Sequence, residues 1–123
     1  MFRNFLLIAL GGGIGSMLRY GMSLMISTRS FPWPTLAVNI IGSFFIGLII
    51  ALSIKEGSVL SNWKLFLATG VCGGFTTFSA FSLENIELLQ SGKYFLAITY
   101  IALSVVLGIA GTCLGFKLIT LNS

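Results

Sequence analysis

Four long apolar segments, separated by short polar connectors, constrain the fold of this 123-residue chain more than any other feature. A helix that crosses a bilayer needs about 20 mostly apolar residues. The segments that meet this length span residues 5–26, 35–54, 64–89 and 95–118. Hydrophobic residues make up 56% of the chain and charged residues 8%, so a soluble domain of this size could not bury its apolar surface. The sequence therefore predicts an all-α membrane protein in which residues 1–123 form a single four-span transmembrane domain.

Positive charge is divided almost evenly between the two ends of these predicted spans. Four spans place both termini on one side of the membrane. The basic residues expected on that side are Arg3, Lys55, Lys64 and Lys117, and those expected toward the other side are Arg19, Arg29 and Lys93. Because an excess of Lys and Arg on one side normally sets the orientation, this near balance predicts insertion in both orientations. Two copies would then pair as an antiparallel dual-topology homodimer; a single, weakly specified topology is the alternative.

Small residues recur at a spacing of four within the predicted spans. The pairs are Gly11 with Gly15, Ser43 with Gly47, and Gly111 with Gly115. Such pairs let two helices approach closely in lipid. We therefore interpret them as helix-packing faces.

Polar side chains also fall into register inside three of the apolar segments. The three stripes consist of Thr35, Asn39 and Ser43; Phe78, Phe81, Ser82 and Asn85, flanked by Thr77 and Ser79; and Tyr100, Ser104 and Thr112. One hydroxyl could serve only as an interhelical hydrogen bond, which contributes roughly 0.6 kcal/mol on average. Stripes on three helices favour a polar pathway across the membrane, because polar groups in a bilayer are costly and usually functional.

The chemistry of these stripes favours a small anion as the transported species. They offer hydroxyl groups, an amide and the electropositive edges of aromatic rings. No carboxylate is expected at mid-membrane, because Glu56 falls in a connector and Glu84 and Glu87 in the last turns of the third span. A cation pathway would instead carry acidic rings. Arg19 either concentrates anions at a vestibule or extends to the lipid headgroups, and the sequence leaves both possibilities open.

The third span contains residues that weaken a helix. Gly70, Gly73 and Gly74 each cost roughly 1 kcal/mol of helix stability relative to alanine. Thr76 and Thr77 follow, and their hydroxyls can hydrogen-bond to the local backbone. We therefore expect the helix to unwind between about residues 73 and 77. The freed carbonyls would need a partner, which could be a monovalent cation, an ordered water or a neighbouring side chain.

Three motifs in these segments resemble the Fluc (CrcB) family of fluoride ion channels. The most specific is GGFTTFSAFS at residues 73–82, which is similar to the family's third-span signature. TLAVNIIGS at residues 35–43 resembles its second-span motif around a pore asparagine. GGGIGSMLRY at residues 11–20 is similar to its first-span motif, which ends near an arginine. The resemblance extends over nearly the whole chain.

The resemblance implies a fluoride-selective channel for passive, electrodiffusive export of cytoplasmic fluoride, which protects the cell from fluoride toxicity. It implies an antiparallel homodimer in the bilayer of the bacterial inner membrane, which is the plasma membrane. The ion-pathway residues that it implies are Asn39, Phe78, Phe81, Ser79, Thr77, Tyr100 and Ser104, with Arg19 near a vestibule. It further implies a structural sodium ion at the dimer axis, held by the backbone carbonyls of Gly73 and Thr76.

Two positions depart from the family pattern, and each removes a possible donor. Ala80 stands between the two phenylalanines, where relatives often carry threonine. Gly108 lies one turn after Ser104, where some carry a second hydroxyl. These departures put the conduction rate and the ion path in question rather than the class of protein.

Other classes of function fit the sequence less well. A small dual-topology proton-coupled multidrug antiporter is the main alternative, but it would require a membrane-embedded carboxylate in an early span. A subunit that assembles without transporting anything is a further alternative. The chain contains no histidine and no grouping of acid, base and nucleophile, so we do not expect an enzyme. Its basic residues are scattered, so we do not expect a nucleic-acid partner.

Overall fold

A computed structural model describes residues 1–26, 30–57 and 61–122 of the chain. Within these residues the structure is helical and contains no strand. The helical segments that are long and apolar enough to cross a membrane are Phe2–Met25, Trp33–Glu56, Asn62–Gln90 and Tyr94–Thr120. They confirm the four predicted spans. Arg29 and part of each of the first two predicted connectors lie outside the described residues.

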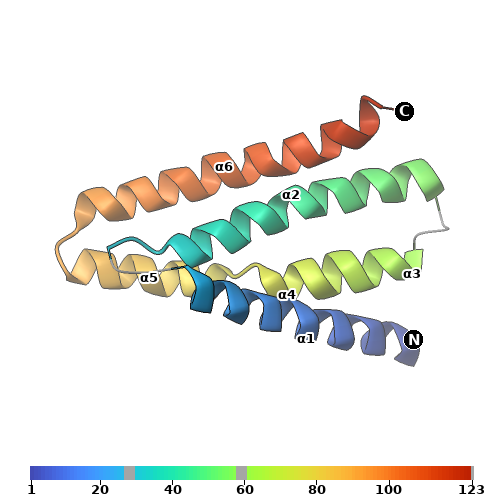
Figure 1. Ribbon diagram of the computed structural model, residues 1–123, viewed down its shortest axis with the longest axis horizontal. Helices are drawn as coiled ribbons and strands as arrows, with labels where there is room; N and C mark the ends of the chain where they lie inside the picture. Colours follow the sequence, from blue (N-terminus) through green and yellow to red (C-terminus); the bar gives the residue numbers. More distant parts are fainter. Residues whose placement is uncertain (27–29, 58–60, 123) are drawn as a thin grey trace.

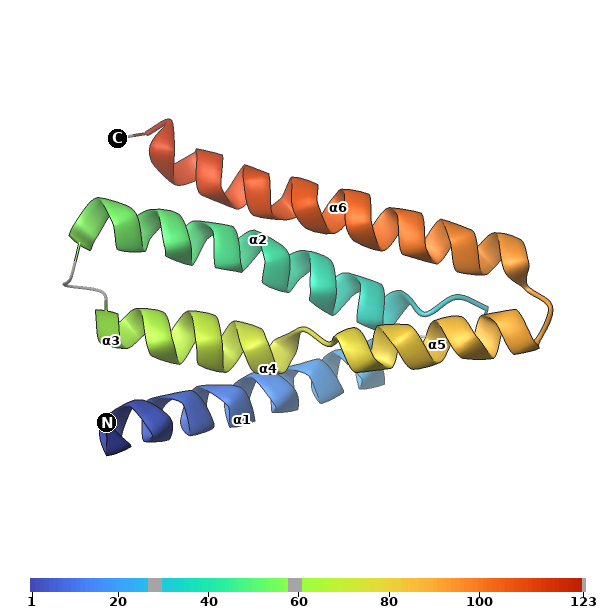
Figure 2. The ribbon, with the colours of Figure 1, turned by 180° about the vertical axis from the view of Figure 1, so that it is seen from behind.

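Successive spans run in opposite directions, and both termini lie at the same end of the molecule (Figure 1). α2 (Trp33–Glu56) lies between α6 (Tyr94–Thr120) and the third span, whereas α1 (Phe2–Met25) packs on the far side of the third span. The view from behind gives the same order (Figure 2). The third span is divided into α3 (Ser61–Lys64), η2 (Leu65–Cys72), α4 (Gly73–Phe75) and α5 (Phe78–Gln90).

Glycine brings the backbone of α1 directly against the third span. A Cβ atom added to Gly15 would collide with the carbonyl of Val71 and would lie 2.7 Å from the backbone nitrogen of Phe75. A Cβ atom at Gly11 would lie 2.9 Å from the Cα atom of Gly70. The predicted packing role of this GxxxG pair is therefore confirmed, because no larger residue would allow the same approach.

The same kind of contact joins α2 to α6 near the end that holds the termini. A Cβ atom at Gly47 would collide with the carbonyl of Thr112, and one at Gly115 would collide with the carbonyl of Phe44. Each would also lie 3.0 Å from a backbone nitrogen of the opposite helix. These two glycines thus set the separation of α2 and α6.

Aromatic and branched side chains fill the opposite end of the molecule. The buried cluster there consists of Phe31, Leu36, Leu88, Ala97 and Tyr100. Tyr100 has no exposed surface, and its ring meets Phe31 edge-on at a centroid distance of 5.4 Å. This geometry is one that aromatic pairs prefer.

The third span breaks at two threonines rather than at its glycines. Thr76 and Thr77 have extended backbone angles, whereas Gly73 remains helical. The predicted break is therefore present, but it is narrower than expected and begins later. The glycines instead allow α1 to pack closely, because a Cβ atom at Gly74 would collide with the backbone of Gly12 in α1. Nothing in the sequence indicated that Leu65–Cys72, immediately before the break, is a π-helix, a form often found at functional sites.

The connector between the third and fourth spans has a defined cap. Gly92 has a φ of 75°, in the left-handed region that favours glycine. The backbone nitrogen of Lys93 donates to the carbonyl of Leu88 at 2.8 Å, and that of Gly92 donates to Leu89 at 3.1 Å. These two bonds form a Schellman motif, which ends α5 and directs the chain into α6.

Candidate functional site

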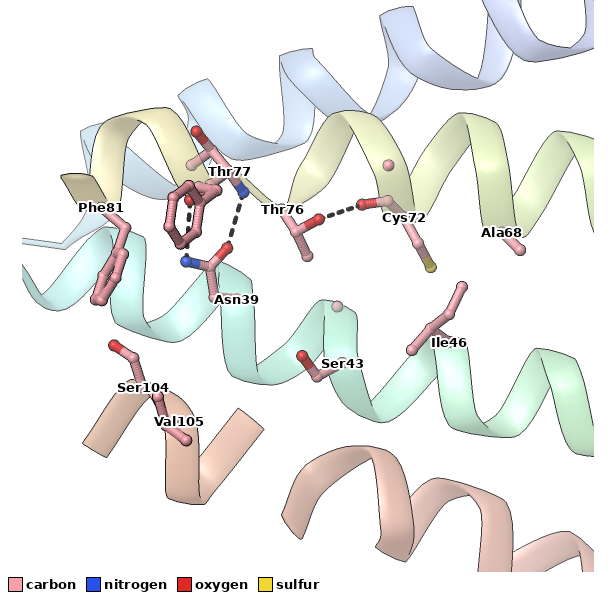
Figure 3. A pocket seen from close by; sticks show the side chains of 13 residues that line it. Asn39, Ser43, Ile46, Ala68, Cys72, Thr76, Thr77, Phe81, Ser104 and Val105 are labelled. Atoms are coloured by element: carbon pink, nitrogen blue, oxygen red, sulfur yellow. Dashed lines mark hydrogen bonds between the residues drawn. The ribbon is translucent and has the colours of Figure 1, made fainter. Parts of the chain in front are cut away.

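A cavity of about 410 Å³ lies beside the break in the third span, between α2, the third span and α6 (Figure 3). Its lining residues are Asn39, Gly42, Ser43, Ile46, Ala68, Cys72, Gly73, Thr76, Thr77, Phe78, Phe81, Ser104 and Val105. The cavity thus brings together residues from all three predicted polar stripes. None of these described residues has a carboxylate or a basic side chain. We call this space the central groove.

Asn39 holds the break in place from the second span. Its side-chain oxygen accepts a hydrogen bond from the backbone nitrogen of Thr77 at 2.8 Å, and its Nδ2 donates to the carbonyl of Thr77 at 3.2 Å. Both bonds are visible in Figure 3. The amide therefore replaces the helical partners that Thr77 has lost. Its second N–H has no acceptor among the described residues.

The two threonines of the break use their hydroxyls locally. Thr76 Oγ1 donates to the carbonyl of Cys72 at 2.9 Å. Thr77 caps α5, because its Oγ1 accepts from the backbone nitrogen of Ala80 at 3.2 Å. The same oxygen lies 3.3 Å from Ser79 Oγ. Ser79 itself is exposed and does not line the central groove.

These bonds release backbone carbonyls from helical pairing. In an unbroken α-helix, Thr77 would donate to Gly73 and Ala80 would donate to Thr76. Here both donors are used by side chains, so the carbonyls of Gly73 and Thr76 lose their helical partners. The carbonyl of Gly74 is satisfied from outside the third span, because it accepts from Arg19 Nε at 3.2 Å. The break therefore offers two oxygens beside the groove and a third that is satisfied by an arginine.

The two phenylalanines lie on neighbouring turns but in different surroundings. Their ring centroids are 5.6 Å apart. Phe81 is half-buried and meets the ring of Tyr100 edge-on at 4.9 Å, whereas Phe78 is 78% exposed. Both line the central groove. A single chain thus fixes the Phe81 ring and leaves the Phe78 ring uncovered.

Ser104 places an unused hydroxyl in the same groove. Its oxygen is buried, and no hydrogen-bond partner is found for it in the part of the chain that the structure describes. Ser104 also lines a second cavity of about 440 Å³, which runs along α6 and includes Gly108, Thr112 and Cys113. Ser43, Ser104 and Val105 line both cavities, so these three residues mark where the two spaces meet.

Tyr100 and Arg19 lie outside the central groove, and their predicted roles in the pathway stay predictions. The Tyr100 hydroxyl donates to Glu84 Oε1 at 2.8 Å. Arg19 lines a separate cavity of about 200 Å³, which Thr77 also borders. Its bond to Gly74 shows that its side chain turns toward the break and does not simply extend to the headgroups.

Glu84 has a role that the sequence pattern did not indicate. It was expected only in the last turns of the third span, but its carboxylate accepts hydrogen bonds from both Tyr100 and Thr35, the latter at 3.0 Å. The signal was available, because polar residues on the second and fourth spans were both expected near the same end. What the sequence could not show was that Glu84 faces inward between them.

The arrangement can bind and pass a small ion but offers no reaction chemistry. Within the described residues, no group of three or more His, Cys, Asp or Glu side chains could hold a metal ion. The groove instead provides one amide, several hydroxyls and aromatic edges. Each of these groups can present a partial positive charge to an anion.

Comparison with known proteins identifies close relatives of this chain. The family model described as CrcB-like protein, Camphor Resistance (CrcB), matches residues 6–116. A protein of Azobacteroides pseudotrichonymphae, named fluoride-specific ion channel FluC, is 45% identical over 121 residues, covering 96% of this chain and 97% of the relative. A protein of the same name from Flavobacterium psychrophilum is 50% identical over 111 residues, covering 88% and 90%. Another from Thermus thermophilus is 48% identical over 118 residues, covering 94% of each chain.

Proposed function

Because the chain belongs to the CrcB-like family, we propose that it is a fluoride-selective ion channel. It gives cytoplasmic fluoride a passive route out of the cell and so protects the cell from fluoride toxicity. The protein is a membrane transport protein and not an enzyme. The observation that carries the proposal is the central groove, whose described lining residues provide donors without a single carboxylate.

The chemistry of the groove supports selectivity for fluoride. Fluoride is small and strongly hydrated, so its water must be replaced by close and fixed donors. Asn39 is held by two hydrogen bonds to Thr77, and Phe81 is held against Tyr100. Such fixed groups suit a small anion better than a larger one such as chloride. The negative membrane potential then drives the anion outward, at about 2.3 kcal/mol for each 100 mV.

The functional unit we propose is an antiparallel dual-topology homodimer in the bacterial plasma membrane. Two features support it. The positive charges are nearly balanced between the two ends, and the ring of Phe78 is largely exposed beside the groove. A second, inverted copy would cover this ring and close the open side of the groove. Each ion pathway would then be lined by both subunits.

A structural sodium ion at the axis of this dimer is also part of the proposal. The carbonyls of Gly73 and Thr76 suit it, because both have lost their helical donors and both residues line the groove. Two oxygens from each chain would supply a shared set of neutral oxygen ligands, as at broken helices in other transporters. When bound, the cation would supply the partner that these carbonyls have lost and would join the two breaks.

Fluoride efflux from liposomes tests the channel directly. The purified protein is reconstituted, and external fluoride is followed with an ion-selective electrode; the assay is repeated with chloride. We expect rapid, passive efflux that is much faster for fluoride. Phe81→Ile and Asn39→Asp should each lower it sharply while the dimer stays intact on size exclusion. Wild-type protein that is well folded but passes no fluoride would refute the proposed function.

Two further measurements test the assembly and the cation. A C-terminal tag should be accessible from both sides of the membrane, and accessibility from one side alone would rule out dual topology. Prolonged removal of sodium should abolish efflux, and its return should restore it. Full activity without sodium would exclude a structural role for that ion.

A multidrug antiporter is not supported. Proton coupling needs a carboxylate that alternates between proton and substrate. The described lining of the groove contains none, and Glu84 is engaged by Thr35 and Tyr100. A dependence of efflux on a proton gradient would reopen this alternative.

A further inference from the structure

The polar side chains of the central groove differ in whether their donors are already used. Thr76 donates to Cys72, and Thr77 accepts from Ala80 and pairs with Ser79. In the adjoining cavity, Thr112 Oγ1 donates to the carbonyl of Ser43 at 2.9 Å, with the carbonyl of Gly108 at 3.2 Å as an alternative acceptor. The threonines beside the path are therefore largely committed to the protein itself.

Two serine hydroxyls, by contrast, have no hydrogen bond to any described residue. Ser104 has a buried oxygen without a partner among the described residues. Ser43 Oγ likewise has no hydrogen bond to any described residue, although serines in a helix commonly bond back to a preceding carbonyl. Both serines line both cavities. A passing anion thus meets two hydroxyls that have no hydrogen bond to any described residue, at the point where the central groove continues along α6.

We infer that the Ser43 hydroxyl is a further fluoride-binding group, which donates to the ion at the junction of the two cavities. This inference rests on the proposed channel function and extends it beyond Asn39, the phenylalanines and Ser104. Ser43 lies one helical turn after Asn39 on α2, so it presents the next donor on the same helix. In Figure 3 its side chain lies between Asn39 and Ile46 on the groove side of α2.

The chain also offers a position from which a replacement hydroxyl can be supplied. A Cβ atom added to Gly108, on the facing helix α6, would lie 3.7 Å from Ser43 Oγ, which is an ordinary van der Waals distance. Gly108→Ser therefore fits without displacing backbone. It would place a hydroxyl close to the one that Ser43→Ala removes.

The test is fluoride efflux from liposomes for wild type, Ser43→Ala and the two double variants Ser43→Ala/Gly108→Ser and Ser43→Ala/Gly108→Ala. Loss of one donor to a charged species should slow efflux by at least about tenfold. The added serine should recover part of that loss, and the added alanine should recover none. Ser53→Ala, also on α2 but outside both cavities, should behave as wild type.

Each outcome separates this inference from the proposed function. Wild-type protein that passes no fluoride would refute the channel itself. If wild type conducts and Ser43→Ala conducts within about twofold of it, the channel stands and the role of Ser43 is wrong. Recovery that is equal for Gly108→Ser and Gly108→Ala would also overturn the donor role. If Ser43→Ala does not fold, Ser43→Cys carries the same test, because a thiol is similar in size but a weak donor.

Discussion

The two ends of this molecule are held together by different forces. At the end that contains both termini, glycines bring backbone against backbone, as Gly47 and Gly115 do between α2 and α6. At the other end, α2, α5 and α6 meet through side chains, with Tyr100 and Thr35 both donating to Glu84. Close backbone contact leaves no room for an ion, whereas side-chain contact can leave a polar path. The central groove lies between the two, beside the break in the third span.

The largest effect should come from the glycine contacts. In Gly15→Ala, the new methyl group collides with the backbone of Val71 and Phe75, which cannot move aside as a side chain would. Overpacking costs about 1–3 kcal/mol, and because this contact is with backbone we expect a loss at the upper end, of about 3 kcal/mol. The measurement is unfolding of the purified protein in detergent. Gly13→Ala is the matched control, because nothing lies within 4 Å of its Cβ position. Equal stability of the two variants would contradict the packing model.

A smaller loss is expected at the polar end. Tyr100→Phe removes the hydroxyl that donates to Glu84 and leaves the rest of the buried ring in place. A hydrogen bond to a carboxylate contributes about 1.5–3 kcal/mol, and we expect a loss of about 2 kcal/mol in the same unfolding assay. Tyr94→Phe, at an exposed ring, should change stability by less than about 0.5 kcal/mol. A wild-type unfolding curve for Tyr100→Phe would show that the network does not hold this end together.

Replacing Arg19 tests the break that lies between the two ends, because its side chain donates to the carbonyl of Gly74 there. Arg19→Gln removes the bond from Nε to the carbonyl of Gly74 and should destabilise the protein by about 1.5 kcal/mol. The loss should be smaller than that of Tyr100→Phe, because the bond is longer, at 3.2 Å against 2.8 Å. Amide hydrogen exchange should rise first near the break. An increase confined to the lipid-facing ends of the helices would indicate that the arginine does not support the break.

The smallest effect should follow the loss of one interhelical hydroxyl. Thr112→Val preserves the shape of the side chain but removes its bond to the carbonyl of Ser43. Such bonds contribute about 0.6 kcal/mol on average in membranes, and we expect a loss of that size. Combined with Gly15→Ala, the two losses should add, since the sites lie on different helix pairs. A loss comparable to that of Tyr100→Phe would mean that hydroxyl bonds also support the glycine-packed end.

The sequence by itself determined the four spans, the presence of a break in the third span and the glycine faces. Each of these depends on residues that are close together in the chain: about 20 apolar residues for a span, or small residues four apart for a packing face. It also identified Asn39, Phe81 and Ser104 as polar or aromatic members of helical stripes, and the structure places all three in one cavity. These features could be read without knowing how the helices are arranged.

The tertiary structure alone decided how the polar groups are used. That Asn39 is bound to the backbone of Thr77, that Glu84 joins Thr35 and Tyr100, and that the Ser43 carbonyl accepts from Thr112 all depend on contacts between distant parts of the chain. The glycines were expected to unwind the helix, but they instead allow α1 to pack closely against it. The break itself lies at Thr76 and Thr77. Helical periodicity fixes which residues share a face, but the rotation and separation of packed helices determine which neighbour that face meets.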